Sequence, residues 1–315
     1  MALDISPFYT RNQGPFAQIF GLPPAESGEL PPPDSTRVRL VLDVANNMLS
    51  GSDEDFTGVD RELVGNDGET LRATVALRHR FAGGLQVGMD IPYVLHSGGV
   101  FDGFIESFHD LFNLAQNGRD HIESGRLLYL YRDIEGETAR VDTSTHGVGD
   151  ILLSAAWQVL SRDRRKMSLC GTLKLPTGES SKLRGSGGAD LSVRANAIDR
   201  QTLGAAHLTP YGSLGLLYAG DGDIIEARQN NWIGFGTIGL GWDPLAWLAL
   251  KVQLDGHTAF YDSRLDQLGD FSMQLVTGGT LLLPREIHLD LGVVEDVTLE
   301  RSPDVVFHLS VWKDF

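Results

Sequence analysis

Hydrophobic and polar residues alternate along most of the chain, with the period of two that is typical of β-strands. In the segment 36–47, Leu40 and Leu42 alternate with Arg39 and Asp43. The ambiguous case is 231–242, where apolar residues occupy both parities. Alternation predicts about twelve strands, at 36–47, 69–81, 84–96, 147–160, 166–176, 189–199, 207–219, 231–242, 245–256, 270–283, 286–299 and 304–315.

The connections between these strands alternate in length. Short links are found at 82–83, 161–165, 243–244 and 284–285, and long ones at 48–68, 97–146, 177–188, 220–230 and 257–269. Outer-membrane barrels have short periplasmic turns and longer extracellular loops around an even number of strands. The pattern therefore predicts an all-β fold, a closed antiparallel transmembrane β-barrel over 36–315 with both termini on the periplasmic side. The alternative, a soluble β-sandwich or lipocalin-like barrel, gives no reason for loop lengths to alternate.

Composition changes this picture little. With 42% hydrophobic and 22% charged residues and a mean hydropathy of -0.10, the chain resembles a soluble protein. A barrel strand faces lipid only at every second residue, so its average hydropathy also stays near zero. No window approaches the ~20 consecutive apolar residues of a spanning helix, which excludes a helical membrane protein. The net charge of -16 argues against nucleic acid as a partner, and the single cysteine excludes an internal disulfide.

In each predicted strand, charged residues occupy the positions that alternate with the apolar ones. Arg or Lys on the lipid face costs roughly 2–4 kcal/mol at the bilayer midplane, so these side chains must point inward. They could form a basic ladder that guides anions or polar ends of solutes, or an internal ion-pair lattice that braces the wall. The predicted lumen-lining residues are Arg37, Arg39, Asp43, Arg72, Arg78, Arg80, Asp90, Lys174, Arg194, Lys251, Asp255, His288, Asp290 and His308.

Aromatic residues near the strand ends are candidates for the girdles that flank a membrane. They are Tyr93, Trp157, Tyr218, Trp242, Trp247 and Phe315. Trp247 and Trp312 fall on the inward parity, so they could cap the floor of the lumen instead.

The segment 1–35 matches neither period and mixes aromatic residues, turn formers and a proline run. Because it precedes the first strand on the periplasmic side, it could fold into the lumen as a plug or pack beneath it. A flexible leader is the alternative, but Phe8, Phe16 and Phe20 favour burial. The segment has no basic and apolar leader, so we expect Met1 to be a mature or re-engineered start.

The second outer loop, 97–146, is far longer than a connection requires. Apolar and aromatic residues recur in it at helical spacing, which predicts a helix with one aromatic face. That helix and the phenylalanines of 1–35 could constrict the pore and form a slot for a hydrophobic solute. Alternatively, the aromatic face packs the loop onto the rim. The loop residues predicted to line the slot are Phe101, Phe104, Ile105, Phe108 and Phe112.

Three short runs resemble known proteins. The ending Val305–Phe315 resembles the C-terminal signal that outer-membrane barrels present to their insertion machinery, although Lys313 stands where that signal favours an aromatic or apolar residue. The runs Arg-Asn-Gln-Gly-Pro-Phe at 11–16 and Phe-Gly-Leu-Pro at 20–23 resemble the start of an uncharacterised family of Gram-negative outer-membrane proteins, all predicted barrels. The resemblance implies the outer membrane of a Gram-negative bacterium, with outer-membrane lipid and lipopolysaccharide as partners.

A further resemblance concerns function. The run at 98–109, together with Lys-Leu-Pro-Thr-Gly at 174–178, resembles a related set of barrels associated with aromatic-compound catabolism and thought to pass small hydrophobic molecules. It implies a narrow channel for hydrophobic or amphipathic small-molecule solutes. The sequence contains no phosphate loop, metal-ligand cluster or dinucleotide fingerprint, so no cofactor or metal is implied.

Two other functions remain open from the sequence. His308 and Ser310 share a strand face at a spacing that resembles the one in lipid A deacylase barrels, which would make the protein an outer-membrane lipid hydrolase. Both residues have the inward parity, whereas a lipid hydrolase needs a site open to the bilayer. A structural or adhesive barrel is the third class, and we expect a channel rather than an enzyme.

Overall fold

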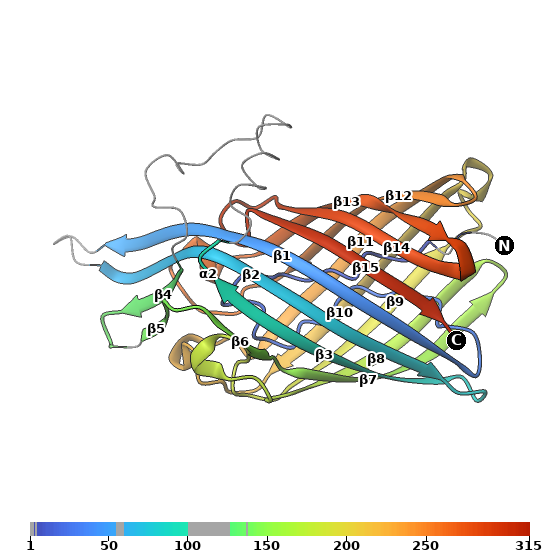
Figure 1. Cartoon of the computed structure of the whole chain (residues 1–315). Coiled ribbons are helices and arrows are strands. Elements are labelled where there is room, and N and C mark those ends of the chain that lie inside the picture. Colours follow the sequence, from blue (N-terminus) through green and yellow to red (C-terminus); the bar gives the residue numbers. More distant parts are fainter. Residues whose placement is uncertain (1–2, 4, 55–59, 100–126, 137) are drawn as a thin grey trace.

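Twelve strands close into an antiparallel barrel in the computed structural model, which describes residues 3, 5–54, 60–99, 127–136 and 138–315. Closure is made by β1, which pairs with β2 on one side and with β15 on the other (Figure 1). The barrel strands are β1 (Ser35–Glu54), β2 (Asp60–Arg80), β3 (Leu85–Ser97), β7 (Ile151–Arg162), β8 (Arg165–Leu175), β9 (Asp190–Asp199), β10 (Leu208–Ala219), β11 (Trp232–Leu245), β12 (Leu248–His257), β13 (Ser272–Leu283), β14 (Ile287–Asp296) and β15 (Val305–Asp314). The predicted strand number and closed barrel are confirmed.

The apolar positions of the strands face outward and the polar positions face the barrel interior, as the alternation predicts. Leu214 is 75% exposed on the outer face, while Lys251 and Asp290 on the inner face are buried. In 232–245 the ambiguity is resolved, because Trp232 is exposed outside and Phe235 is buried inside. An apolar outside around a polar inside is the arrangement of a barrel whose solvent on the outside is lipid.

Three further strands lie at the end with the long connections. β4 (Leu128–Asp133) pairs with β2 at 62–67, β5 (Thr138–Val141) pairs with β4, and β6 (Thr145–Val148) continues β7 along the edge of β3. The prediction of a loop over 48–68 was wrong for most of its length, because β1 and β2 continue to pair up to Glu54 and Asp60. The extension of β2 gains β4 as a second neighbour, which satisfies its backbone groups. The predicted loop helix lies in 100–126, outside the described residues.

The remaining elements are short. They are η2 (Ser180–Lys182), η3 (Gly204–Ala206), η4 (Glu226–Arg228), α2 (Asp266–Gly269) and η5 (Pro284–Glu286). No helix in the described part of the chain is long and apolar enough to cross a membrane. The chain's N and C ends lie together at the end with the short turns, on the right in Figure 1.

The placement of Trp247 on the inward parity was wrong. β11 ends at Leu245 and β12 begins at Leu248, so Trp247 lies in a turn where strand parity no longer applies, and it is 52% exposed. Trp312 is buried inside the barrel, where its ring stacks on His288 with centroids 3.7 Å apart.

Candidate functional site: the barrel interior

The N-terminal segment runs up the barrel interior from the short-turn end, turns at 14–18 and runs back down to β1. We call 5–13 the ascending limb and 19–31 the descending limb. The ascending limb is extended and follows β12 in parallel, with alternate residues bonded to the inward side chains of that strand. Each pair is separated by 245 positions: Ser6 with Lys251, Phe8 with Gln253, Thr10 with Asp255 and Asn12 with His257.

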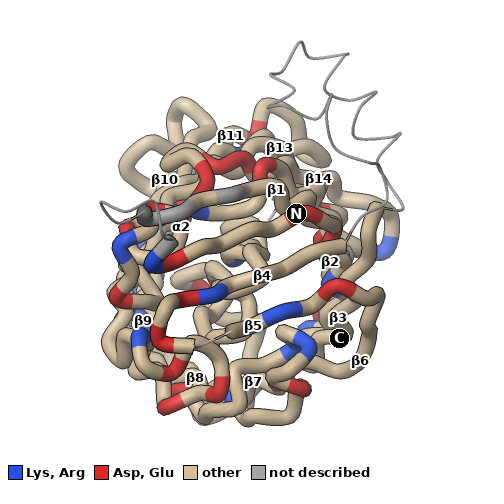
Figure 2. The backbone as a smooth tube through the Cα atoms, turned by 90° about the vertical axis from the view of Figure 1, so that its left-hand side faces the viewer, with Lys and Arg blue, Asp and Glu red and all other residues tan. Residues whose placement is uncertain are grey.

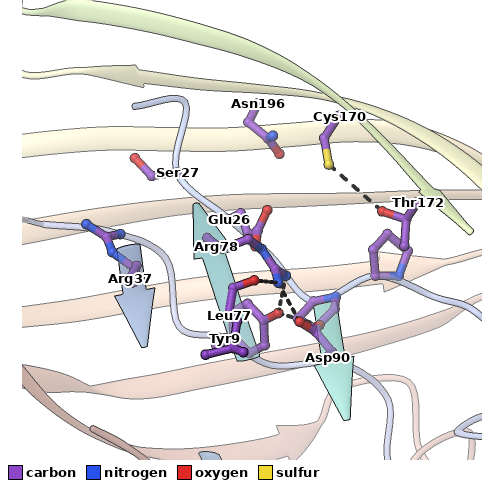
Figure 3. A network of polar contacts seen from close by, with 12 residues as sticks. Tyr9, Glu26, Ser27, Arg37, Leu77, Arg78, Asp90, Cys170, Thr172 and Asn196 are labelled. Atoms are coloured by element: carbon purple, nitrogen blue, oxygen red, sulfur yellow. Dashed lines mark hydrogen bonds and ion pairs between the residues drawn. The ribbon is translucent and has the colours of Figure 1, made fainter. Parts of the chain in front are cut away.

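Two odd-numbered residues of the ascending limb, Tyr9 and Gln13, contact the opposite wall. The Tyr9 hydroxyl donates to Asp90 Oδ2 on β3 at 2.6 Å and accepts from Arg78 Nη2 on β2 at 2.6 Å (Figure 3). Gln13 Nε2 donates to Asp43 on β1 at 2.9 Å. Because successive residues of an extended chain point to opposite sides, this one limb bridges the lumen from β12 to β1–β3.

The turn at 14–18 is buried beneath the long-loop end. Phe20 stacks on Phe260 with centroids 4.5 Å apart, and the Tyr261 hydroxyl donates to the Phe16 carbonyl at 3.0 Å. Arg11 Nη2 holds the turn closed by donating to the carbonyls of Gln18 and Phe20. Viewed from this end, the loops and β4 lie over the ring of strands (Figure 2). We call the apolar cluster beneath them the mouth cluster. It includes Phe16, Ile19, Phe20, Leu22, Tyr129, Tyr131, Leu183, Ile225, Phe235, Phe260, Tyr261 and Leu265.

The descending limb is held largely by charged side chains. Glu26 forms ion pairs with Arg78 at 2.8 Å and with Arg194 at 3.1 Å, so it joins β2 to β9. Near the top, Lys174 Nζ donates to the Ile19 carbonyl at 3.0 Å. Near the bottom, Glu29 pairs with Arg200, and Arg194 also donates to the Pro24 carbonyl. A charge buried in this interior requires a partner, and the limb supplies several.

A β-bulge in β7 contributes to the same limb. The register between β7 and β8 shifts between Gln158 and Leu160. Such a bulge re-aims a side chain, and here Gln158 Nε2 donates to the Gly28 carbonyl at 2.8 Å while its Oε1 accepts from the Leu30 amide at 3.1 Å. At Gly28 an added Cβ would lie 2.6 Å from the Lys166 carbonyl oxygen, so the limb approaches the wall at backbone distance.

The charged residues predicted to line the lumen all lie at inward positions, and seven of the fourteen pair with one another. Asp290 accepts from Lys251 at 3.0 Å and from Arg39 at 3.4 Å. The other pairs are Arg78–Asp90 at 2.5 Å, Lys174–Asp150 at 2.8 Å, Lys174–Asp190 at 3.2 Å, Arg37–Asp314 at 2.7 Å and His308–Asp43 at 2.7 Å. This pairing favours the ion-pair lattice over the open basic ladder. A role for these residues in guiding solutes stays a prediction.

The other five predicted residues have different partners or none, and those of Arg194 and His288 are described above. Arg80 donates to the Pro31 carbonyl, and Asp255 accepts from Thr10 and Thr237. Arg72 is buried opposite Asp43 in the strand register, yet within the described residues it forms no hydrogen bond or ion pair. Asp43 is already bonded to Gln13 and His308.

The predicted slot is described only in part. Phe8, Phe16 and Phe20 are buried in the interior, and Lys251 Nζ lies 3.8 Å from the centre of the Phe8 ring. The loop residues Phe101, Phe104, Ile105, Phe108 and Phe112 lie outside the described residues. Described residues line two small cavities inside the barrel, each of about 40 Å³, one at the short-turn end and one beneath the mouth cluster. Each has room for roughly three water molecules.

The geometry does not assemble a hydrolase site around His308. Ser310 Oγ accepts a hydrogen bond from Arg39, whereas His308 is bonded to Asp43, and no hydrogen bond joins the two residues in the described part of the chain. In the same part, no three His, Cys, Asp or Glu side chains are grouped so as to hold a metal ion.

Several residues of this interior were missed by the sequence analysis, above all Tyr9, Glu26, Asp150 and Gln158. Gln253 stands between Lys251 and Asp255 on the inward parity, so the alternation already marked it. Glu26 lies in an aperiodic Pro-rich run, where no local signal distinguishes it.

Comparison with known protein families matches residues 1–315, the whole chain, to a family described as protein of unknown function (DUF3187). The chain belongs to this family. The expected membership in an uncharacterised family of outer-membrane barrels is therefore confirmed. No curated protein matches this DUF3187 chain.

A solved structure of an outer-membrane channel shares the fold of the DUF3187 barrel. The COG4313 outer membrane channel from Pseudomonas putida F1 is 12% identical, with 91% of this chain and 97% of that chain covered and a TM-score of 0.60. The Pseudomonas putida toluene transporter TodX is 10% identical over 100% and 95% of the two chains, with a TM-score of 0.40. Together with the apolar outer face, the first likeness identifies an outer-membrane β-barrel of a Gram-negative bacterium.

Proposed function

We propose that this barrel is an outer-membrane channel for small hydrophobic or amphipathic solutes, which pass only when the N-terminal segment moves. One observation carries the proposal: the segment bridges opposite walls and leaves cavities of about 40 Å³. A cavity of that size holds waters and not an aromatic ring. Bulk diffusion through the resting lumen is therefore not its task. The likeness to the COG4313 channel, which its own description calls an outer membrane channel, agrees with this class.

The mouth cluster supports an apolar solute. At the long-loop end, the cavity is lined by Phe16, Phe260 and Tyr261 together with polar groups such as Asn47 and His257. Aromatic faces beside a few polar groups are typical of sites that bind small organic molecules. A solute arriving from outside would first meet this surface. The apolar outer face would contact lipid and lipopolysaccharide, and β15 would be the strand presented to the insertion machinery.

The movement can be tested by locking the descending limb. Leu30 packs in one buried cluster with Ala156 and Cys170, the only cysteine of the chain. We expect the variant Leu30→Cys to form a disulfide with Cys170 on oxidation, which mass spectrometry would verify. In liposomes, uptake of toluene, benzoate and benzyl alcohol by the oxidised variant should fall at least tenfold, and reduction should restore it.

The matched control is Leu30→Cys in a Cys170→Ala background, which cannot form the disulfide and should not respond to oxidation. Unchanged uptake by the verified disulfide-bonded form would refute the requirement for movement of this limb. Absence of uptake by the wild-type protein would refute the channel itself.

A further inference from the structure

Four strand segments at the long-loop end form a flap over the mouth of the barrel, and Figure 2 shows β4 and β5 crossing the ring of strands. The flap consists of β1 at 47–54 and β2 at 60–68, together with β4 and β5. In the barrel wall, β1 pairs with β15 up to Asn46, and β2 pairs with β3 from Glu69 onward. Beyond these two residues, the described flap strands pair only with one another. Strand pairing therefore joins the flap to the wall only where β1 and β2 continue into it.

β2 exchanges one neighbour for another at Gly68. The residue before it, Asp67, is opposite β4, and the residue after it, Glu69, is opposite β3. The φ angle of Gly68 is +152°, a conformation that residues with a side chain rarely adopt. A Cβ at this position would also lie 2.7 Å from Leu127 Cδ1 and 3.0 Å from the Ser97 carbonyl oxygen. Glycine therefore lets β2 leave the wall and enter the flap within three residues.

The inner face of the flap is buried in the mouth cluster. Val64 on β2 and Tyr129 and Tyr131 on β4 are at most 1% exposed. They belong to the same cluster as Phe16 and Phe20 of the N-terminal segment. The three flap side chains are removed from water only while the flap lies over the mouth. The flap therefore covers the turn of the segment that fills the lumen.

Arg228 of η4 holds the flap from the opposite side of the ring. Its Nη1 lies 2.6 Å from Glu62 Oε1 on β2, and its Nε lies 3.4 Å from Asp133 Oδ2 on β4. Glu62 Oε2 also accepts from Ser263 Oγ at 2.5 Å and from the Arg264 amide at 3.1 Å, both in the loop between β12 and β13. The side chains of the two carboxylates are at most 1% exposed. A charge buried this far needs its partner, so one guanidinium fixes two strands of the flap.

We infer that the flap is a lid over the mouth of the channel, hinged at Gly68 and latched by Arg228. When the lid lifts, Glu62, Asp133 and Arg228 regain water, which offsets the loss of their mutual attraction. The wall keeps its strand pairing, and a solute from the long-loop side reaches the mouth cluster beneath the lid. The inference rests on the proposed function for the role of the lid in uptake, whereas the motion can be tested without transport.

Hydrogen exchange of the full-length protein in detergent tests the latch. Arg228→Gln removes the cation from two buried carboxylates, so exchange of 60–67 and 128–133 should accelerate at least tenfold while the wall strands stay protected. Arg228→Lys keeps the charge and should accelerate exchange less. The matched control Arg165→Gln removes an arginine paired with Asp199 at the short-turn end and should leave exchange of the flap unchanged. Equal exchange of the flap in Arg228→Gln and in the wild type would overturn the latch.

A disulfide tests the lid in transport. A Cβ at Gly51 of the flap would lie 2.7 Å from Gln267 Cδ of α2, in the loop between β12 and β13. Gly51→Cys with Gln267→Cys, in a Cys170→Ala background, should therefore form a disulfide on oxidation, which mass spectrometry would verify. Uptake of toluene into liposomes should then fall at least tenfold and return on reduction. Either single cysteine variant in the same background is the matched control and should not respond to oxidation.

The two measurements distinguish a failure of the lid from a failure of the channel. Unchanged uptake by the verified disulfide-bonded form, when the wild type does take up toluene, would refute the lid alone. The expected exchange without any uptake by the wild type would refute the channel and keep the lid. Heat-modifiable mobility on gels shows whether each variant still forms the barrel. If Arg228→Gln does not, Arg228→Lys and the disulfide decide.

Discussion

The two limbs of the N-terminal segment cross the same barrel but are held in different ways. The ascending limb contributes uncharged groups to its contacts with the wall, and those with β12 keep a constant separation of 245 residues, so its position depends on matched extended geometry. The descending limb depends on ion pairs to β2 and β9, centred on Glu26. Regularly spaced contacts fix the register of the ascending limb on β12. The few ion pairs of the descending limb can break together. Under the proposed function, we expect the descending limb to be the part that opens.

The largest effect should follow reversal of the charge at Glu26. In Glu26→Lys, Arg78 and Arg194 would both face a cation, and breaking a buried pair costs about 3–5 kcal/mol. We expect hydrogen exchange of 19–31 to accelerate strongly while exchange of 5–13 stays slow, and ion conductance in planar bilayers to rise. The matched control is Glu179→Lys, whose exposed carboxylate pairs with Arg184, and which should change neither. Equal acceleration in both limbs would remove the distinction between them.

Next in size is the loss of Gln253, the central contact of the ascending limb. Its amide bonds both the N–H and the carbonyl of Phe8, and two buried groups would lose their partner at roughly 1–3 kcal/mol each. Gln253→Leu should accelerate exchange of 5–13, measured by mass spectrometry. The counterpart Gln158→Leu should act on 19–31 instead. If both variants affected the same limb, the assignment of contacts to limbs would be wrong.

A steric change at Gly28 tests the same difference between the two limbs. Gly28→Val would place side-chain atoms against the backbone of Lys166 and Ala197, and overpacking of this kind costs about 1–3 kcal/mol. We expect easier proteolysis at Glu26 and Glu29 and a moderate rise in conductance. The matched control is Gly83→Val, in the turn between β2 and β3. It adds a side chain where no atom lies within 4 Å and should leave proteolysis unchanged.

The smallest effect concerns Thr10. Thr10→Val keeps the shape and removes the hydroxyl that donates to Asp255 and accepts from Gln253, a loss of about 1 kcal/mol. Exchange of 5–13 should increase several-fold. Thr237→Val removes another donor to the same carboxylate, from β11, and should leave exchange of 5–13 unchanged. Equal acceleration in both variants would show that Asp255 holds the limb only when both donors are present.

Much of the wall was predictable because a strand's parity is a local property. Alternation of Leu40 with Arg39 is visible in four residues, and it placed both side chains on the correct faces. The alternation gave wrong predictions where the structure depends on turns or on residues far apart in the sequence. Trp247 lies in a turn, and β1 and β2 continue over 48–54 and 60–68, where β2 also pairs with β4, more than 60 residues further on.

The interior was less predictable for the same reason. The segment 1–35 has no period of its own, because its partners are distributed over β1, β2, β3, β8, β9 and β12 rather than along one neighbour. Its aromatic residues indicated burial but not where. Glu26 could be recognised as an anchor only once Arg78 and Arg194 were known to face each other across the lumen.

By itself, the sequence therefore determined the barrel, its strand number, its apolar outside and its charged inside, since hydrocarbon excludes charge at every second position of every strand. Only the tertiary structure decided what fills the lumen and which charges are paired. Those contacts join residues as many as 289 positions apart. The free energy that selects them arises when the ring of strands closes around the segment.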